Sequence, residues 1–474
     1  MDISELNQWL LKNGAKMSAK IEVTDDEIMG RGINVKEDIS ASEKVISIPN
    51  TCLLNYLTIL KHIAVFNYSV KKYLANQGIK ILPALTKSDL ITTIYSKWDI
   101  NELLKLSSVQ LLTLYISLEL KRGDNSFWSP FLNWLPNLDE FKGMPITWQL
   151  SGKKEIVNNL PRNIKKYVLN QCDLFDKDIE NVQKFILQQP LEEKRIDINI
   201  LEFLRVWIGI NTRCLYFPLP SYLPIYKISE NNLTMVPFVD FINHSVNNGE
   251  NAVVKFIRGG CQVITKKEIT RGNHLWFLYG PHDSIKLQCE YGFSPLFTHF
   301  DYIDITPYLT KLISSRGVII EDFLKYFNYW GEYTIDVISN KTIKTEVNFK
   351  TKVAIACLLE RPADFTKLDE DLAKKNENGK PLDISNAKKN TSNFIHWKMP
   401  GRLRRFLDGV DAGPDYLVGT KKLLSKILSK MKDEYKVKLE QLENCEISNK
   451  TEALIAIKII EHDLSIIDSY LDSV

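Results

Sequence analysis

The chain has 474 residues, of which 44% are hydrophobic and 25% are charged, and its formal net charge is only +3. This is the composition of a folded globular protein, and the length exceeds one ordinary domain of about 100–200 residues, so we expect two or three domains. The small net charge argues against a protein whose main task is to grip a nucleic-acid backbone.

The cysteines and the start of the chain indicate the cellular compartment. The seven cysteines are odd in number and include no C-x-x-C pair, which excludes a regular disulfide framework and the common structural zinc spacings. The first residues lack the basic-then-apolar layout of a signal sequence, and no stretch approaches about 18 uninterrupted apolar residues. We therefore expect no metal and no membrane span, and a cytoplasmic protein that is also found in the nucleus.

The N-terminal part predicts a helix over residues 3–12 followed by a small β-unit. The segment Gly30–Pro49, "GRGINVKEDISASEKVISIP", combines a glycine pair, a turn-rich stretch and the alternating strand Val45–Ile48. Gly30 and Gly32 bracket Arg31, so the backbone can turn sharply there and approach a ligand. The third glycine of the dinucleotide fingerprint is missing, which leaves a ligand-binding turn or a plain tight turn.

The middle of the chain changes from helical to β-type character. Residues 53–201 have helical spacing, interrupted by "SFWSPFLNWLPNLDEF". Next, "MVPFVDFINHS" at Met235–Ser245 predicts a buried strand that ends on polar side chains. Ala252–Thr265 predicts a hairpin around two glycines, and "HLWFLYG" predicts a further strand. The sequence therefore places a helical insert between two β-portions.

The residues at the end of the "FINHS" strand are candidates for binding and not for metal coordination. Asn243 and His244 offer hydrogen-bond donors and acceptors but no strong nucleophile. No second His, Cys or carboxylate follows at ligand spacing. Taken alone, the pair would more often be a satisfied turn.

Beyond residue 300 the pattern is mostly helical. Apolar residues step by three and four along two C-terminal helices and predict packing faces. The first face comprises Leu424, Ile427, Met431 and Tyr435, and the second Ala453, Ile457, Ile460, Leu464, Ile467 and Leu471. Residues 369–392, "DEDLAKKNENGKPLDISNAKKNTS", are polar and nearly free of aromatic residues, which predicts a solvated loop.

Two tyrosines, each followed by glycine, close the β-portion. They are Tyr279 and Tyr291 in "LWFLYGPHDSIKLQCEYGF", and singly each would be an ordinary core aromatic. The order of these motifs along the chain is far more specific than any one motif alone. A glycine-bracketed turn, then "DFINHS", then Tyr-Gly and Tyr-Gly-Phe resembles the SET-domain protein methyltransferases. The helical insert and "SFWSPFLNWLP", "NTRCLYFP" and "LTMVPFVDFINHS" resemble the Rubisco large-subunit methyltransferase-like branch and its fungal members.

This resemblance implies an α+β fold. A knotted, β-rich SET domain would span residues 14–300 and be split by a helical insert at about 55–200. An all-α C-terminal substrate-binding domain would follow at 301–474. The chain has Gly272, Asn273 and His274 where the family often has Gly-Glu-Glu, at a surface turn. No cysteine cluster follows "EYGF", so the zinc-bearing segment of histone-directed relatives is absent from the pattern.

The resemblance also implies a site for S-adenosyl-L-methionine, with Tyr279 as the catalytic residue. The implied cofactor contacts are Met29, Gly30, Arg31, Gly32, Arg213, Asn243, His244 and Tyr279. The implied substrate contacts are Arg213, Asp240, Tyr279, Tyr291 and Phe293.

The expected function is S-adenosylmethionine-dependent N-methylation of a protein lysine, in a ribosomal protein or a translation factor, by a monomer. Two alternatives remain open, which are N-methylation of a protein histidine and a catalytically silent SET scaffold that binds a protein partner. Direct nucleic-acid binding is disfavoured because Lys and Arg are spread along the chain.

Overall fold

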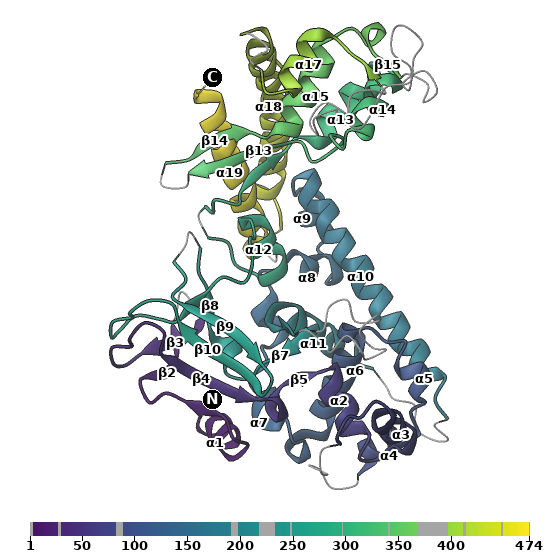
Figure 1. Ribbon diagram of the computed structural model, residues 1–474, viewed down its shortest axis with the longest axis vertical. Helices are drawn as coiled ribbons and strands as arrows, with labels where there is room; N and C mark the ends of the chain where they lie inside the picture. The colour runs from purple at the N-terminus through teal and green to yellow at the C-terminus, as the bar shows by residue number, and fades with distance from the viewer. Residues whose placement is uncertain are drawn as a thin grey trace, which may run out of the picture. The chain divides into compact units, whose positions relative to one another are not determined.

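The computed structural model describes residues 3–26, 30–81, 89–190, 198–217, 233–246, 249–295, 297–339, 342–367, 397–410, 414–446 and 449–473 (Figure 1). The chain divides into two compact units. The first unit comprises Met1–Lys154, Lys166–His282 and Lys286–Ser294, and the second comprises Glu155–Lys165, Asp283–Ile285 and Pro295–Val474.

The β-portion of the first unit is built around a four-stranded antiparallel sheet in the order β1-β4-β10-β9. The strands are β1 (Lys16–Met17), β4 (Lys44–Pro49), β9 (Ala252–Ile257) and β10 (Gly260–Thr265), so the predicted hairpin and the predicted strand at 45–48 are confirmed. A Cβ on Gly260 would lie 2.0 Å from the carbonyl oxygen of Ile48. Only glycine therefore permits β10 to pair with β4 at this point.

Shorter strands complete this portion. The N-terminal helix α1 (Ser4–Lys12) is confirmed. The hairpin β2 (Ile21–Asp26) with β3 (Gly30–Val35) carries the glycine-bracketed turn. The remaining strands are β5 (Leu54–Asn55), β6 (Leu215–Tyr216), β7 (Leu233–Met235), β8 (Asn243–His244) and β11 (Trp276–Phe277).

The single strand predicted over residues 235–245 is wrong. The structure breaks it into β7, a 3-10 helix at Val239–Phe241 and β8. Pro237 lacks a backbone donor, and Phe238 adopts φ 72°, so an extended ladder cannot continue through them. The break turns the backbone carbonyls of residues 240 and 242 toward other side chains, as the candidate site below shows.

A run of helices follows β5, over and just beyond the residues expected to form the helical insert. Its helices are α2 (Tyr56–Ile63), α3 (Tyr68–Asn76), α4 (Leu90–Lys97), α5 (Ile100–Leu103), α6 (Ser108–Arg122), α7 (Ser129–Leu132), α8 (Pro145–Leu150), α9 (Lys154–Asn158), α10 (Arg162–Leu187) and α11 (Ile200–Arg213). Helix α6 is buried on nearly every face and contacts α11 and α2. Its one fully buried carboxylate, Glu119, is neutralised by Arg122 at 2.8 Å. Because α11 ends at Arg213, the insert delivers that side chain to the β-portion.

The second unit is not all-α, which corrects the expectation from the resemblance. It contains an antiparallel sheet of β12 (Tyr302–Asp304), β13 (Thr334–Ser339) and β14 (Lys344–Val347), and a pair of β15 (Thr366–Lys367) with β16 (Trp397–Lys398). Burial alternates along β13, where Ile335 and Val337 point into the core. This is the pattern of a strand with one buried face.

The second unit also contains helices. They are α13 (Thr306–Ser315), α14 (Val318–Tyr326), α15 (Phe349–Leu359), α17 (Gly401–Leu407), α18 (Pro414–Glu443) and α19 (Lys450–Asp472), and α12 (Ser284–Tyr291) leads into them from the first unit. The packing face predicted on α18 is confirmed, since all four of its residues are buried. On α19 the buried stripe is rotated, because Ile457, Leu464 and Leu471 are only half-buried while Ala456, Asp463 and Tyr470 are buried.

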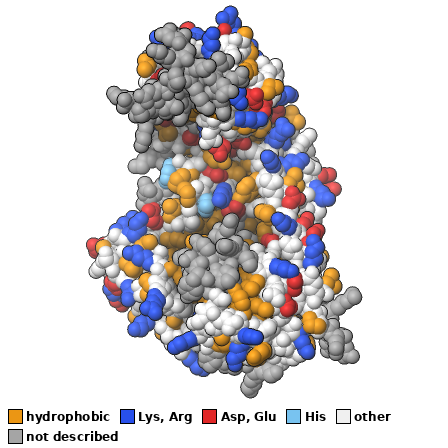
Figure 2. Space-filling view, turned by 45° about the vertical axis from the view of Figure 1, so that its right-hand side comes forward, with side chains coloured by type: hydrophobic (Ala, Val, Ile, Leu, Met, Phe, Trp, Pro, Cys, Tyr) orange, Lys and Arg blue, Asp and Glu red, His pale blue; other side chains and the backbone are white. Residues whose placement is uncertain are grey.

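Three further points bear on function. The predicted loop at 369–392 lies outside the described residues. Among the described residues, no helix is long and apolar enough to span a membrane. Figure 2 shows Lys and Arg side chains scattered among Asp and Glu over the face in view, with no single basic patch.

Candidate active site

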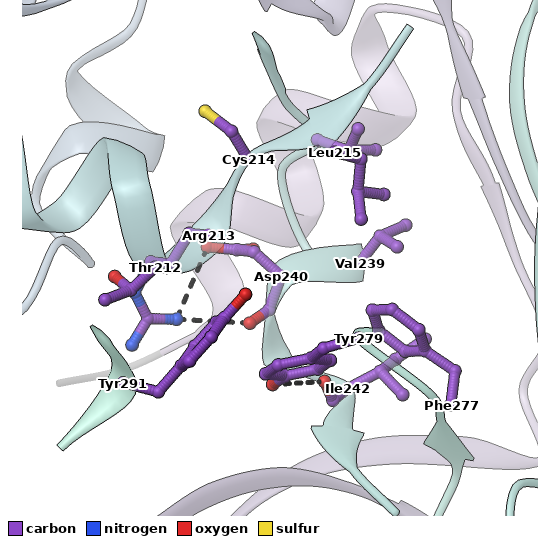
Figure 3. Close-up of a pocket in the computed structure, with 11 residues that line it drawn as sticks. Thr212, Arg213, Cys214, Leu215, Val239, Asp240, Ile242, Phe277, Tyr279 and Tyr291 are labelled. Carbon is purple, nitrogen blue, oxygen red and sulfur yellow. Dashed lines mark hydrogen bonds and ion pairs between the residues drawn. The ribbon is translucent and has the colours of Figure 1, made fainter. Parts of the chain in front are cut away.

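The site is built where two short strands lie side by side. Strand β8 pairs in parallel with β11, so that Asn243 is opposite Trp276 and His244 is opposite Phe277. Tyr279 follows β11 by two residues and is fixed at both ends. Its backbone N–H donates to Nδ1 of His244 at 3.1 Å. Its hydroxyl donates to the carbonyl of Ile242 at 3.0 Å (Figure 3).

The protonation states of this pair follow from burial. Burial, with a smaller contribution from His282, lowers the pKa of His244 to about 4, so its Nδ1 keeps the lone pair that accepts the Tyr279 amide. Burial also raises the pKa of Tyr279 above its ordinary value. Tyr279 is therefore a protonated hydrogen-bond donor at neutral pH and not a base.

Two cavities meet at Tyr279. The first has an empty volume of about 410 Å³ and is lined by Thr212, Arg213, Cys214, Leu215, Val236, Val239, Asp240, Ile242, Phe277, Tyr279 and Tyr291. The second has an empty volume of about 740 Å³ and is lined by Gly30, Arg31, Pro136, Glu140, Phe141, Thr212, Arg213, Asp240, Asn243, Tyr279, Tyr291 and Phe293. The five residues that they share form a junction between a mostly apolar space and a polar one.

Arg213 and Asp240 form an ion pair at this junction. Nη1 of Arg213 donates to the backbone carbonyl of Asp240 at 3.1 Å and lies 3.7 Å from its carboxylate (Figure 3). Burial lowers the pKa of Arg213 and raises that of Asp240, while the attraction between the two charges opposes both shifts. Nε of Arg213 and Oδ1 of Asp240 are buried with no hydrogen-bond partner among the described residues. Two buried polar atoms at the junction are thus available to a ligand.

The glycine-bracketed turn lies against the same strand end. A Cβ on Gly32 would be 3.0 Å from Nδ2 of Asn243, so the absence of a side chain permits this close approach. Gly30 has φ 65°, which favours glycine. Arg31 donates to the carbonyl of Trp134 at 2.7 Å and to Glu140 at 3.0 Å, which ties the turn to the helical insert.

Most of the predicted site residues are brought together. The residues that line one or both cavities are Gly30, Arg31, Arg213, Asp240, Asn243, Tyr279, Tyr291 and Phe293. Gly32 packs on Asn243, and His244 stands behind Tyr279 with its ring 5.0 Å from the tyrosine ring. Met29 lies outside the described residues.

The sequence reasoning missed the contribution of the helical insert. Pro136, Glu140 and Phe141 line the second cavity, and Thr212 lines both. The signal was the segment "NWLPNLDEF", which carries two aromatic residues and one proline and breaks the helical spacing without a strand or turn pattern of its own. Cys214 lines the first cavity, but its thiol points away from the two tyrosines (Figure 3).

Tyr291 is positioned by a close approach between the backbone at Gly143 and the backbone at Gly292. Gln288 on α12 donates to the carbonyl of Gly143 at 2.8 Å. A Cβ on Gly143 would lie 2.9 Å from the carbonyl oxygen of Gly292. Gly292 stands between Tyr291 and Phe293 in the sequence. Burial raises the pKa of Tyr291 to about 12, so it is also protonated at neutral pH. The loop after Phe141 therefore fixes the position of Tyr291, which forms one wall of the junction.

We expect Gly143→Ala to disturb this wall. The added methyl group meets a backbone atom that cannot rotate away, so the C-terminal end of α12 must shift, at a cost of about 1–3 kcal/mol. Kinetics should show a KM for the protein acceptor raised about 5- to 100-fold, which is that energy converted at about 1.4 kcal/mol per tenfold.

Gly259→Ala is the matched control. Nothing lies within 4 Å of a Cβ at that position, and its φ lies outside the left-handed region. Equal KM values for the two variants would show that the contact between Gly143 and Gly292 does not position Tyr291.

The second cavity has the chemistry to hold a cofactor that carries both an amino-acid part and a nucleoside part. The Asn243 amide, the backbone of Gly30 and the unpartnered Nε of Arg213 offer polar groups, and the aromatic rings of Phe141 and Phe293 offer apolar surface. Arg213 supplies the positive charge that a carboxylate requires.

The chain is similar to proteins named as lysine methyltransferases. The family model of the ribosomal lysine N-methyltransferase 2 C-terminal domain matches residues 301–473. The chain is 27% identical over 399 residues to ribosomal lysine N-methyltransferase 2 of Saccharomyces cerevisiae, covering 74% of this chain and 81% of that protein. It is 28% identical over 262 residues to ribosomal lysine N-methyltransferase set11 of Schizosaccharomyces pombe, covering 55% and 59%.

Solved structures share the fold. The structure of Rubisco LSMT bound to AdoMet aligns with a TM-score of 0.56 at 14% identity, covering 99% of this chain and 91% of that one. The structure of the SET domain of LSMT bound to lysine and AdoHcy aligns with a TM-score of 0.54 at 13% identity, covering 99% and 90%. The resemblance expected from "DFINHS" and the two Tyr-Gly motifs is therefore confirmed: the chain shares the fold of the Rubisco LSMT structures and is similar in sequence to the fungal ribosomal lysine N-methyltransferases.

Proposed function

We propose that this protein is an S-adenosylmethionine-dependent protein-lysine N-methyltransferase that modifies a ribosomal protein or a translation factor. The observation that carries the proposal is the junction of two cavities at Tyr279, Arg213 and Asp240, one polar enough for the cofactor and one lined by apolar groups for an acceptor side chain. The similarity to enzymes named as ribosomal lysine methyltransferases supports the substrate class.

Methyl transfer from a sulfonium to an amine is an in-line displacement, and the cofactor supplies an activated methyl group. The protein must hold nitrogen, methyl carbon and sulfur in line, and positioning of this kind can remove roughly 7–11 kcal/mol from a barrier. Tyr279 is suited to this task because its hydroxyl is anchored on the carbonyl of Ile242 and its amide on His244. Its oxygen lone pairs remain free to orient the amine.

The attacking amine must first lose a proton, because a free lysine side chain has a pKa of about 10.4. The apolar walls of the first cavity disfavour the charged amine and lower that pKa. Since Tyr279 stays protonated, the proton leaves to water and not to the tyrosine.

The assignment of individual roles belongs to the same proposal. Tyr279 is the catalytic residue. Gly30, Arg31, Gly32, Arg213, Asn243 and His244 serve the cofactor, and Asp240, Tyr291 and Phe293 serve the acceptor. The retained Tyr279, Asn243 and Arg213 speak against a silent scaffold, because a scaffold has no need of a tyrosine anchored at both ends.

We also propose the SET knot at β8, a substrate-binding role for residues 301–474, a monomeric state and a location in the cytoplasm and nucleus. The parallel pairing of β8 with β11, with the hairpin β9–β10 between them in sequence, is compatible with a threaded strand end. The match of the ribosomal lysine N-methyltransferase 2 C-terminal model supports a specialised role for the second unit.

Amino-acid analysis of the product tests the lysine assignment. Ribosomal proteins from cells that lack this protein would be labelled with a tritiated methyl group, isolated and hydrolysed in acid. We expect the label in N-methylated lysine. Label in methylhistidine would replace the lysine assignment by the histidine alternative.

A further inference from the structure

The surface turn expected at residues 272–274 contains one side chain that is partly buried. Gly272 and Asn273 are exposed, but Nδ1 of His274 is buried and has no hydrogen-bond partner in the described part of the chain. Buried polar atoms in folded proteins nearly always have such a partner. A surface turn therefore does not account for the third residue of the Gly-Asn-His segment.

Backbone pairing turns His274 toward the glycine-bracketed turn. His274 forms an antiparallel bridge with Asn34 of β3, and the bridge is flanked by two backbone hydrogen bonds of 2.8 Å. Side chains of a pair flanked in this way lie close together on one face of the strands. Gly32 precedes Asn34 by two residues and so belongs to the same face of β3.

His274 and Asn243 border the same small space in front of Gly32. A Cβ on Gly32 would lie 3.0 Å from Nδ2 of Asn243 and 3.4 Å from Nδ1 of His274. Cγ of Asn243 would be 4.0 Å away, and Oδ1 of Asn243 is no closer than that. The amide of Asn243 therefore turns its nitrogen end toward the space that Nδ1 of His274 also borders.

The two groups are chemically complementary. The side chain of Asn243 makes no hydrogen bond to any described residue, although Nδ2 carries two N–H groups. An imidazole with its proton on Nε2 presents a lone pair at Nδ1, which can accept one of them. The last torsion of an Asn side chain is soft, so an acceptor at this point fixes which end of the amide is offered to a ligand.

We propose that Nδ1 of His274 accepts a hydrogen bond from Nδ2 of Asn243 when the cofactor is bound, which makes His274 a positioning residue for S-adenosylmethionine. This inference rests on the proposed function, which assigns Asn243 to the cofactor. Asn243 lines the second cavity and His274 does not, so His274 acts through Asn243. Oδ1 of Asn243 then stays available to accept an N–H of the cofactor.

Two variants of similar polarity test the role of Nδ1. The polar atoms of Asn are attached to Cγ, as Nδ1 of histidine is, whereas those of Gln lie one bond further along the side chain. Calorimetric titration should show that His274→Gln binds S-adenosylmethionine about 10-fold more weakly than wild type, while His274→Asn stays within about twofold. We expect kcat at saturating cofactor to stay within about twofold in both, because His274 does not touch the reacting atoms.

Asn273→Ala is the matched control from the same segment. The amide of Asn273 is exposed and donates only to Thr270, so this variant should bind the cofactor as wild type does.

A double-mutant cycle identifies the group through which His274 acts. In the background of Asn243→Ala, His274→Gln should weaken binding by less than about twofold, because its partner is already gone. An equal, about 10-fold loss in both backgrounds would show that His274 acts through another group, such as the buried and unpaired Oδ1 of Asn34, and would overturn the inference.

The remaining outcomes separate this inference from the proposed function. Wild-type affinity in His274→Gln, or equal losses in the Gln and Asn variants, would exclude Nδ1 of His274 as the positioning acceptor and leave the proposed function standing. A wild-type protein that does not bind S-adenosylmethionine would overturn the proposed function and this inference together.

Discussion

Tyr279→Phe should lower kcat about 100- to 1,000-fold while cofactor affinity stays within about twofold of wild type, the range typical of a positioned proton-bearing group. The substitution removes only the hydroxyl, which donates to the carbonyl of Ile242 at 3.0 Å. The ring keeps its packing against His244 and Tyr291, at 5.0 and 5.2 Å between centroids. The amide of Tyr279 keeps its bond to His244 as well.

Single-turnover kinetics and calorimetric titration with S-adenosylmethionine separate the two effects. Tyr291→Phe is the matched control, because in the described part of the chain no hydrogen bond anchors the Tyr291 hydroxyl as the one to Ile242 anchors that of Tyr279. We expect this control to change KM more than kcat. Similar kcat values for wild type and Tyr279→Phe would remove Tyr279 from the catalytic role.

The second large effect concerns stability and its pH dependence. His462 on α19 lies in a buried cluster of the second unit, with Nε2 3.1 Å from Asp301 and Nδ1 3.8 Å from Asp463. Asp301 also accepts from the amides and hydroxyls of Ser284 and Thr298, at 2.6 to 3.1 Å. The cluster therefore joins three segments that are distant in sequence.

His462 is charged at neutral pH. Burial opposes that charge, but the hydrogen bond to Asp301 and the attraction of the Asp301 and Asp463 carboxylates outweigh it and raise the pKa of His462 to about 9. The pKa of Asp301 is subject to the same two effects. Burial raises it, but His462 lowers it below the ordinary value. Tyr435 donates to Asp463 at 2.9 Å, and the ring of Phe297 stacks on His462.

The sign of the pH effect follows from linkage. The pKa of His462 is higher in the folded protein than in the unfolded chain, where it is about 6.5. Its contribution, on the order of 3 kcal/mol, is fully present below about pH 6.5 and is lost as pH rises through 9. We expect the second unit to lose stability between these values.

His462→Gln should abolish that pH dependence and destabilise the second unit by about 3 kcal/mol at pH 6, because two buried carboxylates lose their charged partner. Denaturant unfolding at pH 6 and pH 9.5 measures both effects. His299→Gln changes an exposed histidine close to the same cluster and should leave both unchanged. A slope with pH that is the same in wild type and His462→Gln would rule out His462 as its source.

The sequence predicted the parts of the site that belong to short motifs with a fixed order. The "FINHS" and Tyr-Gly motifs located Asn243 and Tyr279, and the two glycines located the turn that packs on Asn243. Physical reasoning from single residues did not bring them together, because their approach depends on the parallel pairing of β8 and β11, which are more than 30 residues apart. The resemblance to a family supplied that step.

The misses have physical causes. Buried apolar residues at 235–242 fit a strand as well as a buried turn, and only the strained backbone at Phe238 separates the two. Strand β12 has three residues and β14 is the polar segment "KTEV", so neither carries a hydrophobic pattern. On α19 the buried face includes Asp463 as well as apolar residues, because the cluster with Asp301 needs that face.

Transfer of a tritiated methyl group from S-adenosylmethionine to an extract of cells lacking this protein tests the central claim most directly, with wild-type and Tyr279→Phe enzyme side by side. We predict one discrete labelled ribosomal protein or translation factor with wild type and none with the variant, although both bind the cofactor. No labelled protein with the wild type, despite calorimetric binding of the cofactor, would contradict the account and leave a scaffold that binds a partner.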